Sequence, residues 1–226
     1  MAEEVQLNFE DAVLYGRDLG LLSPPEWLND ACVHLGFRVI ASEVGDERVL
    51  LMDPSVYSYM LLQCDEADEF AELRTSLRLE QRALVLIPVN DADSFDVVAR
   101  GTHWSLLAYW SADDAYEHYD SMPTSAHARV AAPRAVAKFN RARGGEARAL
   151  RRVEIPAQTT SYDCGAHVLA VADSLARSLD RRAEDRSVSH VTPAYVADFR
   201  RRLRDKAYAL SEDYLRAKLH SKDSDK

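Results

Sequence analysis

The stretch HWSLLAYWSADDAYEHYD, residues 103–120, decides the fold of this chain. Aromatic and apolar side chains fill its first half, from His103 to Trp110, and polar and apolar residues alternate over its last five, Tyr116 to Asp120. Both patterns are typical of strands, and the intervening residues 111–115 have the composition of a turn. The stretch therefore predicts an antiparallel hairpin with strands at 103–110 and 116–120.

This hairpin has a chemical consequence at its open end. If the turn is centred between Ser111 and Ala112, residues equidistant from that point form pairs, and His103 faces Asp120. Directly opposed residues of antiparallel strands have Cβ atoms roughly 5 Å apart. A carboxylate at that distance would fix the orientation and tautomer of the imidazole and stabilise its protonated form.

The pattern on either side of the hairpin is mixed. An apolar run at 83–89 predicts a buried strand, 90–101 a polar loop, and 150–155 a further strand. Helical periodicity and capping signals predict helices at 27–42, from Asp53-Pro54 onward, at 66–74, at about 125–141 with Pro133 inside and Gly144-Gly145 after it, at 164–179, and from Thr192-Pro193 onward. Helices combined with a run of strands indicate the α+β class.

Length and composition limit the function. The chain has 226 residues, which suits one domain, here 1–220, followed by a polar tail at 221–226. A net charge of -9 argues against a nucleic-acid partner. We expect no membrane span and no signal peptide. Three widely spaced cysteines predict free thiols and a reducing compartment, the cytoplasm or the nucleus. No spacing suggests a metal site or a cofactor.

One of the three cysteines, Cys164, lies in SYDCG, residues 161–165, and opens a predicted apolar helix. The partial positive charge and unpaired N–H groups of a helix N-terminus favour a thiolate over a thiol, and the N–H groups can also bind an oxyanion. Gly165 would let a substrate backbone approach closely. The other two, Cys32 and Cys64, are expected to be buried and inert.

A neutral amide completes the set. Gln158 lies six residues before Cys164, where its side chain can donate a hydrogen bond to a developing oxyanion. The sequence thus holds a nucleophile, a base in His103, an orienting carboxylate in Asp120 and an oxyanion donor. These four groups are what thiol-dependent acyl transfer requires.

Several blocks of the chain resemble the signature blocks of the Ulp/sentrin proteases, which process ubiquitin-like proteins. They are GTHWSLL at 101–107, HYDS at 118–121, PAQ at 156–158, SYDCG at 161–165 and, nearer the N-terminus, WLND at 27–30. The order His, Asp, Gln, Cys also matches. Within the family the chain most resembles the deneddylase branch, through Pro24-Pro25 before WLND, VND at 89–91, Ser161-Tyr162 and TPAY at 192–195.

The resemblance implies a papain-like fold of the Ulp/adenain type, with two lobes around a central mixed β-sheet and flanking helices. It implies that Trp27 and Trp104 line a narrow tunnel for the modifier's diglycine tail and that Asp30 binds that tail. The loop around Asn90 and Asp91 would contact the modifier's globular face. It further implies a monomer that needs no cofactor and acts on a Nedd/Rub modifier and its conjugates, such as neddylated cullins.

Other interpretations stay open at this point. The modifier could be SUMO or ubiquitin, the domain could bind a ubiquitin-like protein without catalysis, or it could be an acyltransferase with the same Cys-His arrangement. His167, one helical turn after Cys164, is expected to be structural, because its ring would point along the helix rather than across a cleft. The basic run from Arg200 to Arg204 is expected to form a solvated helix face.

Overall fold

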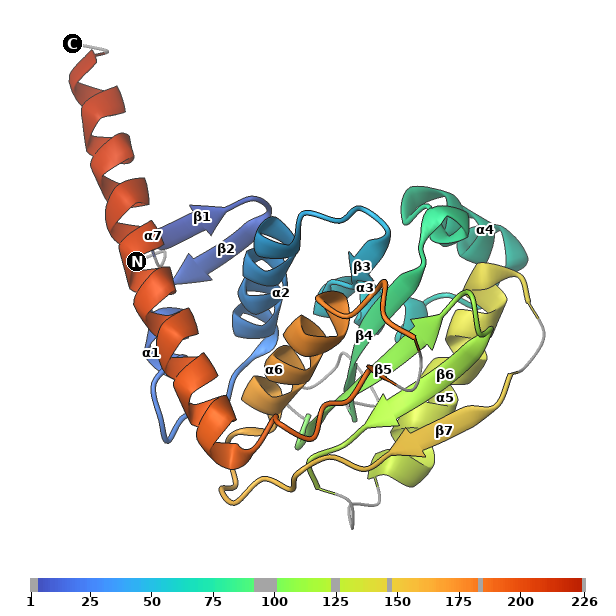
Figure 1. The fold of residues 1–226 in the computed structure, drawn as a ribbon. Coiled ribbons are helices and arrows are strands. Elements are labelled where there is room, and N and C mark those ends of the chain that lie inside the picture. Colours follow the sequence, from blue (N-terminus) through green and yellow to red (C-terminus); the bar gives the residue numbers. More distant parts are fainter. Residues whose placement is uncertain (1–3, 92–100, 123–126, 146–147, 183–184, 225–226) are drawn as a thin grey trace.

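The computed structural model describes residues 4–91, 101–122, 127–145, 148–182 and 185–224 (Figure 1). In chain order its elements are β1 (Val5–Phe9), β2 (Ala12–Tyr15), α1 (Gly16–Leu21), α2 (Asp30–Val44), β3 (Val49–Leu51), α3 (Pro54–Leu62), α4 (Ala67–Ser76), η1 (Leu79–Gln81), β4 (Leu84–Asn90), β5 (Trp104–Trp110), β6 (Ala115–Tyr119), α5 (His127–Arg143), β7 (Leu150–Val153), α6 (Cys164–Ala176) and α7 (Pro193–Ser224).

The centre of the fold is a five-stranded mixed sheet in the order β3-β4-β5-β6-β7. The three middle strands run antiparallel to one another, whereas the outer strands β3 and β7 each run parallel to their neighbour. Helices α2 and α6 lie on one side of this sheet, and α5 lies on the other (Figure 1). The predicted α+β class with a central mixed sheet and flanking helices is confirmed.

The predicted hairpin is confirmed as β5 and β6, but its register is wrong by one residue at the turn. Leu106 pairs with Tyr119, so the turn is centred one residue later than predicted. By this register Asp120 stands opposite Ser105, not opposite His103. Moving the centre by one residue displaces each partner by two positions, which leaves every side chain on its own face of the sheet. His103 is therefore a diagonal neighbour of Asp120, which a histidine ring can still reach.

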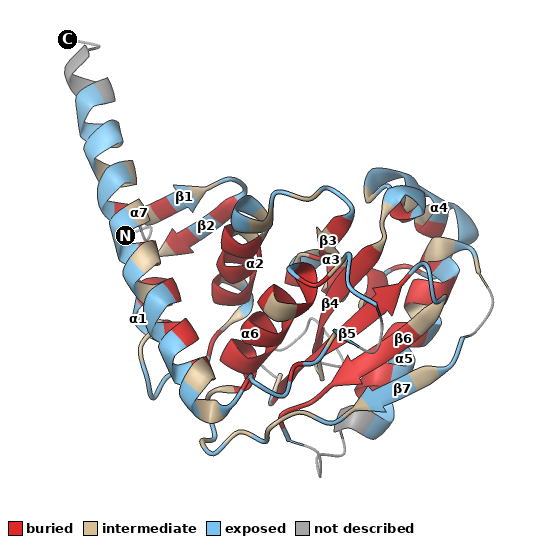
Figure 2. Cartoon of the chain, in the orientation of Figure 1, coloured by how far each residue is buried: buried red, intermediate tan, exposed pale blue. Residues whose placement is uncertain are grey.

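Strand β4 is buried on both faces, as its continuous apolar run predicted. Leu84 and Leu86 belong to a core shared with β1, β2, α2, α6 and α7. The alternating residues Val85 and Ile87 belong to a second core shared with α3, α4 and α5. Figure 2 shows β4 in red, together with red stretches of α2 and α6. The sheet therefore separates two hydrophobic cores, in agreement with the two lobes that the resemblance implied.

Local capping sets where two helices begin, and α2 begins at Asp30 rather than at the predicted residue 27. Asn29 accepts a hydrogen bond from Cys32 N at 3.0 Å and caps α2, and the carboxylate of Asp53 accepts one from Ser55 N at 2.7 Å before Pro54 opens α3. Side-chain oxygens of this kind satisfy the otherwise unpaired N–H groups of a first helical turn. At the other end of a helix, Gly144 follows α5 with a φ of +73°, which glycine adopts without strain.

The two ends of the chain differ from expectation. A hairpin, β1 and β2, was not predicted; its residues Leu7, Ala12 and Leu14 are fully buried, while the apolar Val13 between the last two is exposed. At the other end the backbone of α7 is helical as far as Ser224, where the sequence had suggested a polar tail from residue 221. In Figure 1 the last turns of α7 extend away from the rest of the fold.

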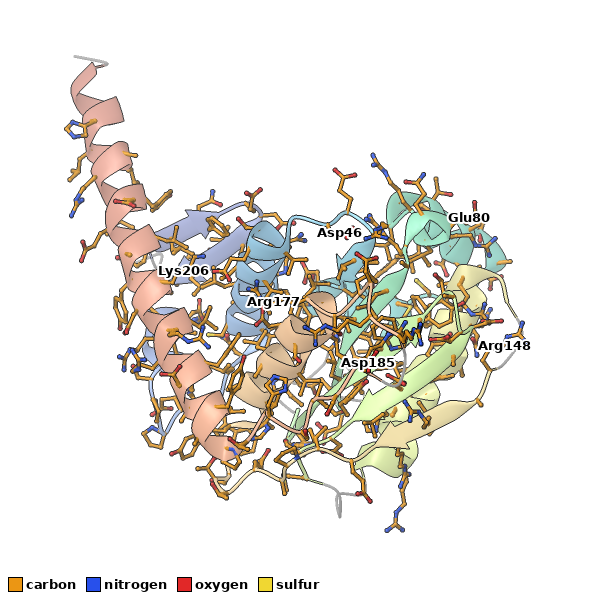
Figure 3. All side chains as sticks on the ribbon, in the orientation of Figure 1. Asp46, Glu80, Arg148, Arg177, Asp185 and Lys206 are labelled. Carbon is orange, nitrogen blue, oxygen red and sulfur yellow. The ribbon has the colours of Figure 1, made fainter. Side chains whose placement is uncertain are left out.

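Ion pairs connect three helices. Glu43 of α2 accepts hydrogen bonds from Arg177, which follows α6, at 2.8 Å and from Lys206 of α7 at 2.6 Å. Figure 3 labels Arg177 and Lys206 in this region.

Within the described residues, no helix is long and apolar enough to cross a membrane, and no group of three or more potential ligands could hold a metal ion.

Candidate active site

The predicted base and its orienting carboxylate meet at one end of the sheet. His103 directly precedes β5 and Asp120 directly follows β6, and because these strands are antiparallel, the two residues lie at the same end. The His103 Nε2 and Asp120 Oδ1 atoms are 2.7 Å apart, and both side chains are buried. Met122 N donates a second hydrogen bond to Asp120 Oδ1 at 2.8 Å. Both hydrogen bonds end on the same oxygen of Asp120, which fixes the carboxylate, and the predicted pairing with His103 is confirmed.

The protonation of His103 is governed by its two partners. Burial alone lowers the pKa of its imidazole, but the hydrogen bonds and negative charges of Asp120 and Cys164 outweigh burial and raise the pKa to about 9. With Nε2 bound to Asp120, Nδ1 is the ring nitrogen left to interact with the sulfur. At neutral pH the His103 ring is therefore protonated beside Cys164, and a cationic neighbour of this kind favours the reactive form of a cysteine nucleophile.

Cys164 is the first residue of α6 and is only 2% exposed. The preceding residue, Asp163, occupies the N-cap position, yet its side chain makes no capping hydrogen bond to the helix. The N–H groups of the first turn are therefore not occupied by their own cap. Such N–H groups next to a nucleophile can stabilise an oxyanion, as the sequence predicted.

Gly165 packs closely against another segment of the chain. A Cβ atom at this position would lie 3.0 Å from Leu28 Cβ, closer than ordinary side-chain contacts. The packing of α6 against the segment before α2 therefore favours glycine here, and the approach of a substrate backbone to Gly165 stays a prediction. This contact does place Leu28 next to the nucleophile.

The oxyanion donor Gln158 is held by its neighbours. Its Oε1 atom accepts a hydrogen bond from Ser121 Oγ at 2.6 Å, and its backbone N–H donates to Ser121 O at 3.0 Å. Its Nε2 atom donates to Thr160 O at 2.7 Å. An amide nitrogen carries two N–H donors, so one of them is left for an oxyanion. Because Ser121 follows Asp120 in the chain, the amide is tied to the end of the strand that carries the base's partner.

The two tryptophans expected to line a tunnel have different environments. Trp104 is 5% exposed, and its Nε1 atom donates to Leu28 O at 3.0 Å. Trp27 is 44% exposed. Trp104 thus fixes the segment that carries both Leu28 and Trp27, whereas Trp27 presents an apolar surface to solvent, as a residue that meets a substrate would.

Asp30 is exposed in the first turn of α2. The protein around its carboxyl group partly desolvates it and, together with the negative charge of Asp53, raises its pKa. A cation placed beside these two carboxylates would reduce their repulsion. The environment of Asp30 is therefore compatible with the predicted binding of a basic residue.

The residues expected to contact the modifier's globular face are engaged within the chain. Asn90 ends β4 and pairs with Trp104. The carboxylate of Asp91 accepts hydrogen bonds from Thr102 N at 2.6 Å, from Thr102 Oγ1 at 2.5 Å and from His103 N at 3.3 Å. Asp91 therefore holds the backbone that leads into His103. Most of the predicted loop, residues 92–100, lies outside the described residues.

The remaining cysteines and the second nearby histidine have the expected structural character. Cys32 and Cys64 are buried, and burial raises the pKa of the Cys32 thiol to about 12. His167 is 2% exposed, and neither ring nitrogen has a hydrogen-bond partner in the part of the chain that the structure describes. Burial, aided by the positive charge of His103, lowers the pKa of His167 to about 4 against the attraction of Asp163. A neutral ring at working pH suits a structural residue.

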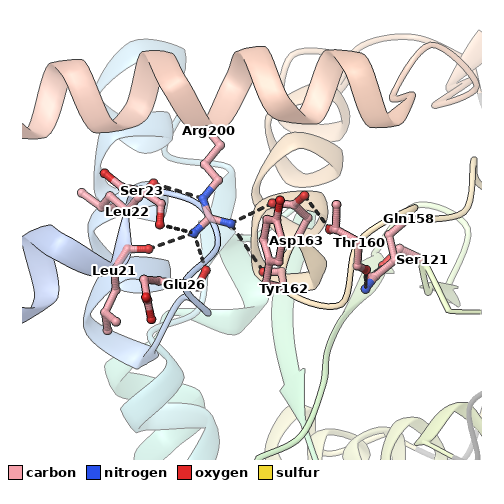
Figure 4. A network of polar contacts seen from close by, with 10 residues as sticks. All are labelled: Leu21, Leu22, Ser23, Glu26, Ser121, Gln158, Thr160, Tyr162, Asp163 and Arg200. Atoms are coloured by element: carbon pink, nitrogen blue, oxygen red, sulfur yellow. Dashed lines mark hydrogen bonds and ion pairs between the residues drawn. The ribbon is translucent and has the colours of Figure 1, made fainter.

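The sequence interpretation missed Arg200. It was expected on a solvated helix face, but it is 1% exposed and its guanidinium bonds to Asp163 and to backbone carbonyls of the segment before α2 (Figure 4). Its neighbour Arg201 does face solvent, with 56% of its side chain exposed. The helical period separates the two arginines, and a periodicity count over α7 would have placed residue 200 on the apolar side with Val196 and Leu203.

Comparison with known proteins agrees with this geometry. The profile of the Ulp1 protease family, C-terminal catalytic domain, matches residues 26–214. Sentrin-specific protease 8 of Homo sapiens is 32% identical over 208 residues, which cover 90% of this chain and 96% of that protein. NEDD8-specific protease 1 of Arabidopsis thaliana is 29% identical over 167 residues, covering 74% of this chain and 73% of that protein.

Solved structures show the same fold. The C-terminal Ulp1 protease domain in complex with Smt3, the yeast ortholog of SUMO, matches with a TM-score of 0.67 and 17% sequence identity, covering 95% of this chain and 90% of that chain. A structure of the SUMO protease Ulp1 with its catalytic cysteine oxidised to a sulfonic acid matches with a TM-score of 0.68 and 18% identity, over 95% of this chain and 91% of that chain. From the matched profile, the fold and the buried Cys-His-Asp site, we conclude that this chain is a cysteine peptidase of the Ulp1 protease family.

Proposed function

We propose that this protein is a deneddylase, a thiol isopeptidase that cleaves after the C-terminal diglycine of a Nedd/Rub modifier. The chemistry is supported above all by the 2.7 Å contact between His103 Nε2 and Asp120 Oδ1, beside Cys164 at the start of α6. The choice of modifier is supported by the identity to sentrin-specific protease 8 and NEDD8-specific protease 1. Both relatives are matched over most of their length.

The reaction uses the site in two stages. The Cys164 thiolate, formed by proton transfer to His103, attacks the carbonyl carbon of the terminal glycine and gives a tetrahedral oxyanion. Gln158 Nε2 and the backbone N–H of Cys164 donate to that oxyanion. When the intermediate collapses, His103 gives its proton to the leaving amine and a thioester remains. His103 then takes a proton from a water molecule, which hydrolyses the thioester and releases the modifier's carboxylate and the Cys164 thiol.

Three residues around the active site would recognise the modifier's tail. Trp27 offers an exposed apolar ring, and Trp104 anchors the Trp27 segment through its hydrogen bond to Leu28 O. Only glycine residues fit a passage that excludes a Cβ atom. Asp30 provides a carboxylate for a basic residue before the diglycine. We further propose that the protein acts as a monomer in the cytoplasm or nucleus, on Nedd precursors and on conjugates such as neddylated cullins.

The proposal is tested with a panel of fluorogenic amides and of propargyl electrophiles built on Nedd, SUMO and ubiquitin. We expect the fastest turnover and the fastest labelling with the Nedd reagents, and no reaction in Cys164→Ala. Faster reaction with the SUMO or ubiquitin reagents would reject the choice of modifier, because specificity is a ratio of transition-state affinities. Tight binding of Nedd without turnover by the wild type would reject catalysis.

A further inference from the structure

Arg200 of α7 is a buried charge that the reaction does not use directly. It is 1% exposed and is among the largest fully buried side chains of the described part of the chain. A guanidinium in such a place is stable only when its N–H groups are paired, because taking a charge out of water costs several kcal/mol. Its partners therefore show what the residue is for.

One set of partners lies in the segment between α1 and α2. The guanidinium donates to four backbone carbonyl oxygens there: Leu21 O at 2.9 Å, Leu22 O at 3.0 Å, Ser23 O at 3.3 Å and Glu26 O. Leu28 follows this segment, and it both accepts the hydrogen bond of Trp104 and packs against Gly165. Arg200 thus fixes the chain that passes directly over the start of α6.

The other partner is the residue before the nucleophile. Arg200 Nη1 donates to Asp163 Oδ1 at 2.7 Å, and the other carboxylate oxygen, Oδ2, accepts from Thr160 Oγ1 at 2.6 Å. Thr160 O in turn accepts from Gln158 Nε2 at 2.7 Å. Figure 4 shows this chain of contacts running from α7 to the oxyanion donor.

These contacts explain why Asp163 does not cap α6. Aspartate is among the residues most favoured at the N-cap, where its carboxylate accepts hydrogen bonds from the N–H groups of the first turn. Here both carboxylate oxygens are bound elsewhere, and no side-chain capping bond is made. As an N-cap, the Asp163 carboxylate would accept from the N–H groups of Gly165 or Ala166, and it would place a negative charge beside the Cys164 N–H, where the oxyanion must form.

We propose that Arg200 is a positioning residue that holds the Asp163 carboxylate away from the first turn of α6 and thereby keeps the oxyanion site open. The inference rests on the cysteine-peptidase chemistry of the site and is independent of which modifier is cleaved. Without the guanidinium, Asp163 turns onto the helix, its negative charge repels the tetrahedral oxyanion, and the acylation step slows while the protein remains folded.

The test is Arg200→Lys, with the neighbouring Arg201→Lys as matched control. The substrate is the Nedd, SUMO or ubiquitin tail amide that the wild type hydrolyses fastest, and kcat is expressed per active site titrated with the corresponding propargyl electrophile. We expect Arg200→Lys to lower kcat by roughly 10-fold to 100-fold, the loss typical of a weakened oxyanion site. For Arg201→Lys we expect a kcat within about twofold of the wild type, since surface changes have small effects.

The double variant Arg200→Lys/Asp163→Ala separates positioning from stability. It removes the carboxylate that would cap α6, so we expect kcat per active site to recover by at least about threefold over Arg200→Lys. A purely structural ion pair would change the melting temperature and the number of active sites, but not kcat per site. The inference is rejected if kcat per site in Arg200→Lys equals that of the wild type, or if the double variant recovers nothing.

If Arg200→Lys does not fold, Thr160→Val decides. This change removes the hydroxyl that holds Asp163 Oδ2 and leaves Arg200 intact. We expect kcat per active site to fall by about 3-fold to 10-fold, the effect of one hydrogen bond, with a melting temperature within about 2 °C of the wild type. An unchanged kcat would overturn the inference.

Discussion

His103 and His167 are both buried and both lie beside Cys164, but their pKa values are shifted in opposite directions. The carboxylate of Asp120 and the sulfur of Cys164 raise the pKa of His103 to about 9 in spite of burial. His167 has no hydrogen-bond partner within the described residues, so burial dominates and lowers its pKa to about 4. The comparison teaches that burial alone makes a histidine inert, whereas burial with a charged partner makes it a proton carrier.

The largest expected effect comes from removing each ring. His103→Gln should lower kcat/KM by about 10³-fold or more, because the substitution removes both the general base and the proton donor for the leaving amine. His167→Gln should lower it by less than about tenfold, since this ring takes no part in proton transfer. Hydrolysis of a fluorogenic tail amide measures both. Equal losses in the two variants would show that the histidines are not functionally distinct.

The next effect concerns the carboxylate that distinguishes the two rings. Because the pKa of His103 is raised to about 9, the protonated ring persists at neutral pH and wild-type activity falls only as the pH rises through about 9. Asp120→Asn removes a negative charge that holds this proton. We expect the alkaline limb of kcat/KM to move to lower pH by at least about 1 unit, with a loss of about 10²-fold at the optimum. An unmoved alkaline limb would contradict the pairing.

A smaller effect is expected on stability in acid. The pKa of His167 is about 4 in the folded protein and 6.5 in a model histidine, so below pH 6.5 the unfolded chain binds a proton that the folded chain does not. The folded state should therefore lose up to roughly 3 kcal/mol as the pH falls from 6.5 to about 4. His167→Leu should reduce this loss. Urea unfolding between pH 4 and pH 7 measures it, and an identical acid dependence in the variant would exclude His167 as its source.

The smallest effect is the influence of the sulfur on the two rings. Cys164→Ala removes the hydrogen bond and the charge of Cys164, both of which raise the pKa of His103. We expect the His103 ring to titrate below about 9 in this variant but still above an ordinary histidine, because Asp120 remains. His167 should stay neutral at pH 7. Histidine ring resonances followed by NMR between pH 4 and pH 10 measure both, and a fully ordinary titration of His103 would refute the role of Asp120.

Sequence patterns predicted most of the sheet and helices because those signals are local. The apolar run of β4 and the Asp53-Pro54 start of α3 each act within a few residues of their own position. The short hairpin of β1 and β2 was missed because β2 shows no alternation of polar and apolar residues: the exposed position between Ala12 and Leu14 is the apolar Val13. The register of β5 and β6 was one residue wrong because it depends on the geometry of the turn. Because this error shifts strand partners by two positions, His103 and Asp120 still lie on the same face of the sheet.

The residues of the candidate site were likewise predicted only in part. Cys164, His103, Asp120 and Gln158 were identified from motif and spacing, and the structure places the first three in contact. The contact of Gly165 with Leu28 was not predicted, because Leu28 is distant in the sequence. Arg200 was misassigned because a run of basic residues hides the single position that turns inward.

The sequence by itself determined which chemical groups this protein has and their order along the chain, because residue identity, strand alternation and the start of a helix are properties of neighbouring residues. The tertiary structure alone decided which histidine holds a proton, which arginine is buried, and where the Asp163 carboxylate points. Those outcomes depend on desolvation and on contacts between segments far apart in the chain, such as Arg200 with Asp163, and neither is written in any local pattern.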